Sequence, residues 1–376
     1  MFKDIGRLLG DLKRGYTRGR ARHPDQPLVA KLYRGYRSKS KLFVQGRVLE
    51  HEDVTVTPGD RRFTNFVNAL RRLETDEIAG AGVRVTYRDR DFDLVTDPEG
   101  YFLIHEEVAD DRVDDVWEPV TAQITSLPRG ESPDEIYEGG VADLANTSDV
   151  AIVTDIDDTI LQTGITSVLK LRAIYRTLAD NAYTRMPFAG APELFRALHS
   201  GQGPTEKRNP VFYLSNSPWN LYAMLEEFLD HRGFPKAPIF LRDIGLPYEN
   251  SPRGGSHKEL TLKRLLADFP TLQFVLIGDS GEHDADIYNA LAKEHPDRVR
   301  AVVIRNVKNN ANARRIERMF SRKRPEQHFY IVKDSVQAAR ELARIGLIDE
   351  KHVEEVRRGM EAGTRDLDVP TEAALA

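Results

Sequence analysis

The chain has 376 residues, of which 40% are hydrophobic and 30% charged, with a net charge of −5, and this balance is typical of a globular protein. The absence of cysteine excludes disulfide frameworks, zinc–thiolate sites and cysteine nucleophiles. No apolar run approaches the ~18 residues of a membrane-spanning helix, and residues 1–30 lack the apolar core of a secretory signal, so we expect a cytoplasmic protein.

Residues 1–40 are expected to form a basic N-terminal arm. Residues 1–41 hold 12 Lys and Arg against three acidic residues, a local charge of +9, which leaves −14 for the remainder. Such an asymmetry indicates a segment that meets an anionic membrane or nucleic acid, or alternatively a solvated and poorly ordered terminus.

Residues 41–147 are expected to form a smaller β-rich domain. Short runs with strand-like alternation dominate it, and Arg62–Leu73 carries apolar residues on one side of a predicted helix. We recognise no catalytic or metal-binding motif in this segment. The predicted strands are Leu42–Leu49, Gly82–Tyr87, Tyr101–Glu106 and Val120–Ile124.

Residues 148–335 show short strands alternating with helical patterns. These strands are apolar on both faces, as in a parallel sheet flanked by helices, so we predict an α/β domain. The residues from Leu221 to Leu229 have the spacing of an amphipathic helix, with Ser217 and Pro218 as its N-cap and first turn. The predicted strands are Val150–Thr154, Val211–Leu214, Pro238–Leu241, Phe274–Ile277 and Val299–Ile304, with His328–Val332 as an edge strand.

Residues 336–376 are expected to close the chain with helices and a tail. Helices are predicted at Gln337–Ile345 and Glu350–Met360, and a loose tail is predicted beyond Gly363.

Two acidic residues follow the first strand of the α/β domain. Asp155 and Asp157 stand two residues apart, and such crowding of negative charge is costly without a cation. Mg²⁺ prefers oxygen ligands and would let Asp155 approach a phosphate group as a nucleophile. Asp157 could protonate the leaving oxygen and then activate water against an acyl-phosphate. A loop of caps and turns without chemistry is the alternative reading.

Two other predicted strands also end in polar groups. Ser215 stands where a strand meets a helix N-terminus, a place that favours a bound anion. Asp279 and Asp284 stand in a glycine-containing turn after another strand. Because ligands of open α/β sheets bind at the carboxyl ends of the strands, we expect Asp279 to complete a cation site opposite Asp155. Asp284 either supports the metal or a ligand, or caps the helix that follows.

Lys258 is the candidate cation on the protein side. Ser256 and Glu259 form a capping box, which places Lys258 in the first turn of a helix, where the helix dipole disfavours it. A nearby nucleophile and substrate would explain its position better. His257 and His283 are expected to be solvated loop residues.

In this order, the motifs resemble those of the haloacid-dehalogenase-like phosphatase superfamily. More narrowly, the sequence is similar to the catalytic domain of actin-patch-associated phosphatidate phosphatases and their bacterial relatives, over about residues 145–310. The matching stretches are Thr154–Thr159, Tyr213–Trp219, Lys258, Gly278–Asp284 with Ile287 and Tyr288, and Ile304–Val307.

The resemblance implies a Rossmann-like sheet, dependence on Mg²⁺ and an aspartyl-phosphate intermediate. It implies that Asp155 is the nucleophile and Asp157 the acid/base, and that Ser215 and Lys258 hold the phosphoryl group. Many superfamily phosphatases have Gly where this chain has Asp158, which leaves the local geometry there open.

The resemblance also implies the remaining contacts. Mg²⁺ would be bound by Asp155, the carbonyl group of Asp157 and Asp279, with Asp284 in support. Arg305 follows a strand at the same edge and either contacts a substrate head group or is surface charge. The predicted substrate contacts are Thr159, Asn216 and Arg305.

We therefore predict a Mg²⁺-dependent phosphatase that converts phosphatidate to diacylglycerol. The basic arm would hold it peripherally on an anionic membrane, since each Lys or Arg near the bilayer contributes about 1 kcal/mol. One alternative is a phosphatase of a soluble sugar, nucleotide or nucleic-acid phosphate, and another is a lipid-binding scaffold with a relict site. Residues 165–178 carry a helical pattern that fits a cap, core packing or an interfacial surface. Nucleic acid is the less favoured partner, and the oligomeric state stays open.

Overall fold

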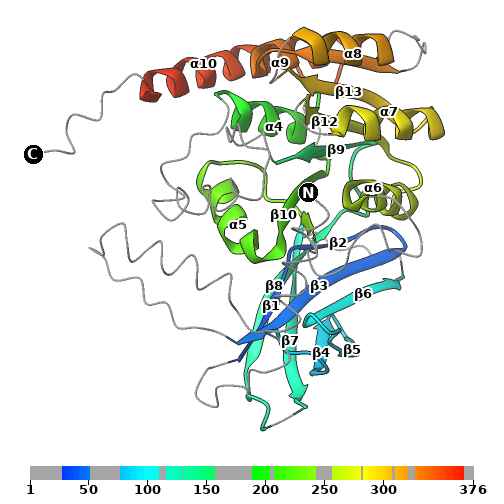
Figure 1. Cartoon of the computed structure of the whole chain (residues 1–376), viewed down its shortest axis with the longest axis vertical. Coiled ribbons are helices and arrows are strands. Elements are labelled where there is room, and N and C mark those ends of the chain that lie inside the picture. Colours follow the sequence, from blue (N-terminus) through cyan, green and yellow to red (C-terminus); the bar gives the residue numbers. More distant parts are fainter. Residues whose placement is uncertain are drawn as a thin grey trace, which may run out of the picture.

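The computed structural model describes residues 28–50, 77–109, 116–128, 130–156, 189–203, 207–242, 256–280, 283–306, 310–320 and 327–367. These residues form a β-rich sheet and a parallel sheet with flanking helices (Figure 1). The predictions for the arm before residue 28, the helix at 62–73 and the helical pattern at 165–178 lie outside them. In the part of the chain that is described, no helix combines the length and the apolar character needed to cross a bilayer.

The β-rich sheet has eight strands, in the order β1-β3-β2-β8-β7-β4-β5, with β6 paired to β3. Its core consists of alternate side chains of these strands, such as Val83 and Val85, as expected for a sheet with one buried face. The strands are β1 (Leu28–Leu32), β2 (Gly35–Arg37), β3 (Lys41–Glu50), β4 (Gly82–Tyr87), β5 (Arg90–Val95), β6 (Tyr101–Glu107), β7 (Trp117–Ser126) and β8 (Ile136–Asp143). The four strands predicted in this segment are confirmed.

Strands β1 and β2 lie in the segment that we expected to belong to the basic arm. Leu28, Ala30 and Leu32 are buried in the core of the β-rich sheet, while Lys31 points away and lies 3.6 Å from Glu226. The alternation of apolar and polar side chains therefore places this segment in the sheet despite its basic charge. The basic arm ends before β1 and does not extend to residue 40.

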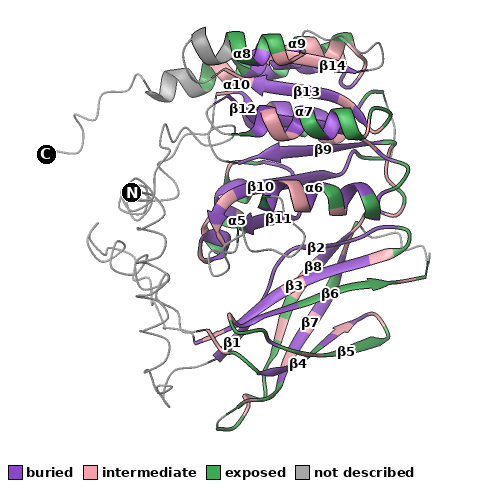
Figure 2. Ribbon diagram, turned by 45° about the vertical axis from the view of Figure 1, so that its right-hand side comes forward, coloured by how far each residue is buried: buried purple, intermediate pink, exposed green. Residues whose placement is uncertain are grey.

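The parallel sheet has six strands in the order β11-β10-β9-β12-β13-β14, and every neighbouring pair is parallel. Its interior strands are buried on both faces, as Figure 2 shows. The strands are β9 (Val150–Asp155), β10 (Val211–Pro218), β11 (Ile239–Arg242), β12 (Gln273–Asp279), β13 (Val299–Arg305) and β14 (His328–Val332). All six predicted strands are confirmed, with β14 at the edge.

Helices form a layer on each face of the parallel sheet. One apolar cluster contains residues of α4 (Ala191–Ser200), α5 (Tyr222–His231), α9 (Ser335–Arg344) and α10 (Glu350–Leu367). The other contains residues of α6 (His257–Asp268), α7 (Asp284–Glu294) and α8 (Asn310–Phe320). The predicted tail was wrong over residues 364–367, because one interior glycine costs a helix only about 1 kcal/mol and α10 continues past Gly363.

The β-rich sheet packs directly against the α/β domain. The Tyr36 hydroxyl donates a hydrogen bond of 2.5 Å to Asp268 at the end of α6, and the His105 ring lies 3.0 Å from the same carboxylate. The Tyr36 ring also belongs to the apolar cluster that contains Phe212 and Phe240. Side chains of both sheets therefore share one core, and α6, which begins beside the candidate site, ends against the β-rich sheet.

Candidate active site

Three neighbouring strands bring the predicted acidic and hydroxyl groups to one edge of the parallel sheet. Asp155 is the last residue of β9, Asp279 is the last residue of β12, and Ser215 lies near the end of β10. Since β9 lies between β10 and β12 and all three are parallel, their carboxyl ends meet at the centre of this edge.

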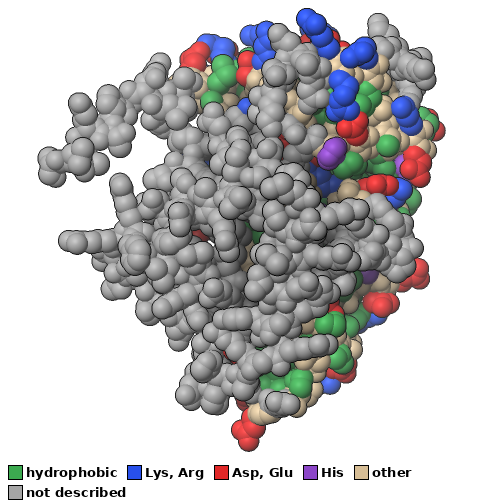
Figure 3. All heavy atoms as spheres, viewed as in Figure 1, with side chains coloured by type: hydrophobic (Ala, Val, Ile, Leu, Met, Phe, Trp, Pro, Cys, Tyr) green, Lys and Arg blue, Asp and Glu red, His purple; other side chains and the backbone are tan. Residues whose placement is uncertain are grey.

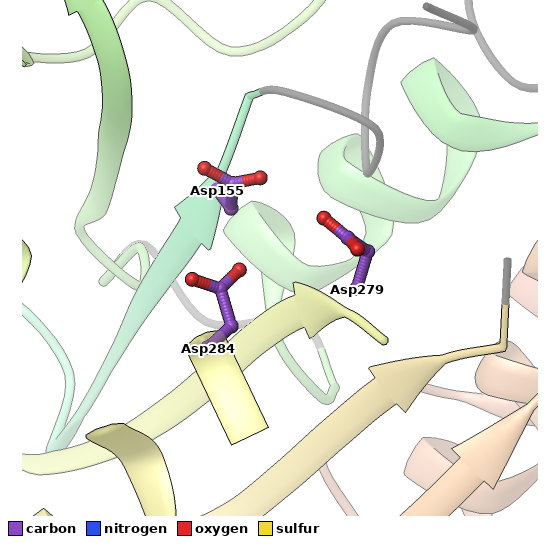
Figure 4. A group of neighbouring side chains, drawn as sticks. All are labelled: Asp155, Asp279 and Asp284. Atoms are coloured by element: carbon purple, nitrogen blue, oxygen red, sulfur yellow. The ribbon is translucent and has the colours of Figure 1, made fainter. Parts of the chain in front are cut away.

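Three buried carboxylates converge at this edge (Figure 4). One oxygen from each of Asp155, Asp279 and Asp284 lies within 4.8 Å of the others, and all three side chains are buried. The prediction that Asp279 lies opposite Asp155 is therefore consistent with the geometry. Asp284 begins α7 and points back toward the other two residues.

Lys258 connects two of these carboxylates. Its Nζ lies 2.7 Å from Oδ1 of Asp155 and 2.7 Å from Oδ1 of Asp284, and the residue is 1% exposed. Ser256 caps α6 by accepting a hydrogen bond from the backbone N–H of Glu259, as predicted. The two ion pairs account for a lysine in the first turn of a helix, where the dipole disfavours it.

Asp284 does not cap α7 in the way that the alternative reading required. The N-cap residue is His283, which is exposed as expected, and Asp284 is the first helical residue. Its carboxylate accepts a hydrogen bond of 2.7 Å from Lys258 instead. The acid at this position therefore serves the cluster rather than the helix end.

The cluster has more negative than positive charge. Three carboxylates and one ammonium group give −2 when all four are ionised, and all four side chains are buried. Burial raises the pKa of the Tyr288 hydroxyl well above its usual value, and Asp284, Asp155 and Asp279 contribute to the increase. A hard dication such as Mg²⁺ prefers oxygen donors and would offset the charge, so this donor set fits it.

Gly278 allows α7 to approach β12 closely enough for Asp284 to enter the cluster. A Cβ atom at this position would lie 2.5 Å from Oδ2 of Asp284 and 2.9 Å from the Tyr288 ring. We expect Gly278→Ala to displace Asp284 and to lower the free energy of unfolding by about 1–3 kcal/mol, as overpacking typically does. Denaturant unfolding of the wild type and of Gly278→Ala checks the prediction. Unfolding unchanged in Gly278→Ala would contradict the proposed close packing.

Ser215 is buried, and its Oγ accepts a hydrogen bond of 2.9 Å from the backbone N–H of Ser217. The expected cap by Ser217 was wrong, because β10 continues to Pro218 and a 3₁₀ turn, η1 (Trp219–Leu221), precedes α5. Asn216 is half-buried in β10. The hydroxyl of Ser215 thus shapes the end of the strand.

Of the remaining predicted residues, one lies on β13 and three lie outside the described residues. Arg305 is half-buried at the end of β13, paired in register with Asp279 on β12. Asp157, Asp158 and Thr159 lie outside the described residues. The structure therefore brings together Asp155, Lys258, Asp279 and Asp284, with Ser215, Asn216 and Arg305 on the two adjoining strands.

His257 is buried, so its expected position in a solvated loop was wrong. It is the first residue of α6, and burial lowers its pKa to about 4, while a hydrogen bond with the backbone of Phe240 opposes that decrease. The local sequence at the start of α6 could not predict this burial, because the burial depends on how α6 packs against a strand that is distant in the sequence.

The lowered pKa of His257 predicts acid destabilisation. The unfolded chain takes up a proton near pH 6.5 and the folded chain only near pH 4, so stability is lost as the pH falls between these values. We expect the loss to be about 2 kcal/mol between pH 7.5 and 5. Denaturant unfolding of the wild type and of His257→Gln at both values isolates this contribution. An equal loss in both proteins would contradict it.

Comparisons with known proteins match the segment that contains these residues. Residues 150–306 match the family model described as the catalytic domain of phosphatidate phosphatase APP1. Over 179 residues the chain is 30% identical to phosphatidate phosphatase APP1 of Saccharomyces cerevisiae, which covers 47% of this chain and 29% of the yeast protein. Over 221 residues it is 26% identical to an uncharacterised protein of Schizosaccharomyces pombe, covering 58% and 35% of the two chains.

The chain spans about a third of the length of these curated relatives. Among solved structures, a carbohydrate acetylesterase from Xanthomonas citri aligns with a TM-score of 0.33 and 8% identity over 90% of this chain and 73% of that one, a score too low to indicate a shared fold. The family model and the yeast protein together confirm, for residues 150–306, the predicted resemblance to the catalytic domain of phosphatidate phosphatases.

Proposed function

We propose that the chain is a Mg²⁺-dependent phosphatase that hydrolyses phosphatidate to diacylglycerol and phosphate, on a sheet of the haloacid-dehalogenase-like type. The observation that carries the proposal is the buried pair of Lys258 and Asp155, 2.7 Å apart, beside Asp279 and Asp284. The similarity of residues 150–306 to a phosphatidate phosphatase supports the lipid substrate. The retained acidic and basic groups argue against a scaffold with a relict site.

In the proposed reaction, Asp155 attacks the phosphorus atom. The bond from phosphorus to the ester oxygen breaks as an aspartyl-phosphate forms, and Asp157 gives a proton to the leaving alcohol. Asp157 then accepts a proton from the water that cleaves the aspartyl-phosphate, which releases phosphate and restores the Asp155 carboxylate. Lys258 and Ser215 bind the phosphoryl oxygens throughout, and the charge of Lys258 opposes the negative charge that they carry.

The carboxylates divide into two proposed roles. Asp155, Asp279 and the carbonyl group of Asp157 would hold Mg²⁺, which when bound offsets the charge of the phosphoryl group. Asp284 supports this site by holding Lys258, since their charged atoms lie 2.7 Å apart. Thr159, Asn216 and Arg305 are the further proposed substrate contacts, and Asn216, which adjoins Ser215, would contact the phosphoryl group.

Basic residues support an action at an anionic membrane surface. The arm carries a strong excess of Lys and Arg, and on α8 the side chains of Arg314, Arg315 and Arg318 are exposed. In Figure 3 the Lys and Arg side chains gather at the top of the molecule, in the region of α8 and α9. On α8, Arg315 pairs at 2.7 Å with Asp286 in the first turn of α7, the helix that Asp284 begins, so Arg315 lies near the site.

A substrate panel tests the metal and the lipid together. We expect phosphate release from phosphatidate vesicles to stop in EDTA, to return with Mg²⁺ and to fall as salt rises, because surface electrostatics is screened. A variant without residues 1–27, which leaves β1 intact, should lose activity on vesicles but keep it on a soluble aryl phosphate. If vesicles are no better a substrate than the aryl phosphate, the enzyme is instead a phosphatase of soluble substrates. Full activity in EDTA would contradict the metal requirement.

A further inference from the structure

The β-rich sheet contacts the chain directly after the proposed phosphoryl-binding segment, Ser215 and Asn216. This segment leads into Pro218 and the turn η1, and Trp219 in that turn is buried. Trp219 stacks on Tyr33 from the β-rich side at 4.4 Å between ring centroids, and Tyr101 of β6 packs on it at 6.4 Å. The anchor of η1 is therefore provided by residues outside the matched catalytic segment.

Arg47 of β3 is the polar centre of this contact. Its Nη1 donates a hydrogen bond of 3.0 Å to the Asn220 side-chain carbonyl in η1, and its Nη2 donates one of 2.8 Å to Glu77. Its Nε donates a third, of 2.7 Å, to the backbone carbonyl of Glu99. The guanidinium also lies over the Tyr101 ring, at 4.3 Å from the centroid, and the residue is 2% exposed.

The chain between Ser215 and η1 depends on such an anchor because the sheet supports it weakly. The pairing of β10 with β11 is regular up to Leu214, shifts between Leu214 and Pro218, and resumes at Pro218 with Arg242. A strand end without continuous ladder pairing can move, whereas a buried arginine whose three nitrogen atoms all donate hydrogen bonds has a fixed geometry. Through its hydrogen bond to Arg47, Asn220 fixes the position of the chain five residues after Ser215.

We propose that Arg47 is a positioning residue for the phosphoryl-binding segment, acting through Asn220. The inference rests on the proposed function, because it assumes that Ser215 and Asn216 bind the phosphoryl group. It assigns a role to the β-rich sheet, which would complete the active site instead of forming a separate module. A displacement of about 1 Å in a substrate-positioning group can cost up to about a hundredfold in rate, so the expected effect is large for a contact remote from the chemistry.

A double-mutant cycle in the full chain tests the proposal. The variants are Arg47→Met, which keeps the apolar stem over Tyr101, Asn220→Leu, and the two combined. Arg84→Met is the matched control, since Arg84 lies in the same sheet and pairs with Asp93 on an exposed face. The readouts are kcat/KM on an aryl phosphate, the affinity for inorganic phosphate with Mg²⁺, and hydrogen exchange of the amides from Ser215 to Leu221.

The cycle separates positioning from general stability. We expect each single variant to lose at least about tenfold in kcat/KM and in phosphate affinity, and the double variant to lose no more than the worse single one, because both changes break one contact. Losses that simply add would assign Arg47 a structural role and overturn the proposal. If the wild type binds phosphate and the Arg47 and Asn220 variants have the same kcat/KM and phosphate affinity as Arg84→Met, the proposal is overturned as well.

The exchange measurement keeps this inference distinguishable from the proposed function. If the wild type neither binds phosphate nor hydrolyses the aryl phosphate, the proposed function fails, and with it the role of the segment. Faster exchange from Ser215 to Leu221 in both single variants, with Arg84→Met unchanged, supports the anchor independently of turnover. Unchanged exchange in both overturns it.

Discussion

Replacing Asp155 by Asn is expected to lower phosphate release by at least about 10⁴-fold. The change removes the proposed nucleophile while keeping the size of a side chain that is fully buried at the end of β9. Rate losses of this order are measured when the catalytic nucleophile of an enzyme is removed. Lys258 keeps its second partner, Asp284, so the variant has no uncompensated ammonium group. Phosphate release from both vesicles and an aryl phosphate is the measurement.

The same change should not destabilise the protein when divalent cations are absent. It lowers the charge of the four-residue cluster from −2 to −1, which reduces the repulsion between buried carboxylates. We expect the melting temperature in EDTA to be equal to that of the wild type or higher. Asp286→Asn is the matched control, because Asp286 lies in the first turn of α7 and pairs with Arg315 on the surface. A folded Asp155→Asn protein with undiminished turnover would reject the assigned nucleophile.

The strands of the α/β domain could be predicted because burial on both faces produces continuous apolar runs. In the β-rich sheet, the same reasoning missed β1, β2, β5 and β8. Strand β5 is an exposed edge with the sequence RDFDLV, which has too few apolar residues to be distinguished from a loop. Strand β8 contains Gly139, where a Cβ atom would lie 2.6 Å from the side chain of Leu32 in β1. Glycine lowers the strand signal there, yet close packing requires it.

The candidate site could be predicted where topology alone brings residues together. Asp155 and Asp279 end neighbouring parallel strands, so their proximity follows from the fold class. The exact partners of Lys258 depend on the direction in which α6 begins, and the entry of Asp284 depends on the close approach of α7 at Gly278. The contact of Arg47 with Asn220 joins residues 173 positions apart and has no signature in the sequence.

Replacing Lys258 by Met is expected to lower both activity and stability. The side chain is similar in length, but Asp155 and Asp284 lose the ammonium group that lies 2.7 Å from each of them. Removing one partner of a buried ion pair typically costs 3–5 kcal/mol, so we expect a loss of about this size in the free energy of unfolding in EDTA. Turnover should fall by about 10²–10³-fold, as when a group that stabilises transition-state charge is removed.

A second substitution separates the two effects of Lys258. Lys258→Met combined with Asp284→Asn leaves one buried carboxylate fewer, so we expect it to recover part of the lost stability, by about 0.5–3 kcal/mol of coupling. It should recover no turnover, since the positive charge beside the phosphoryl group is still missing. Lys263→Met on the same helix is the control, because Lys263 is half-exposed and pairs with Glu259 at the surface. If the double variant were less stable than Lys258→Met, the charge of the carboxylates would not be what Lys258 offsets, and its place in the site would need another explanation.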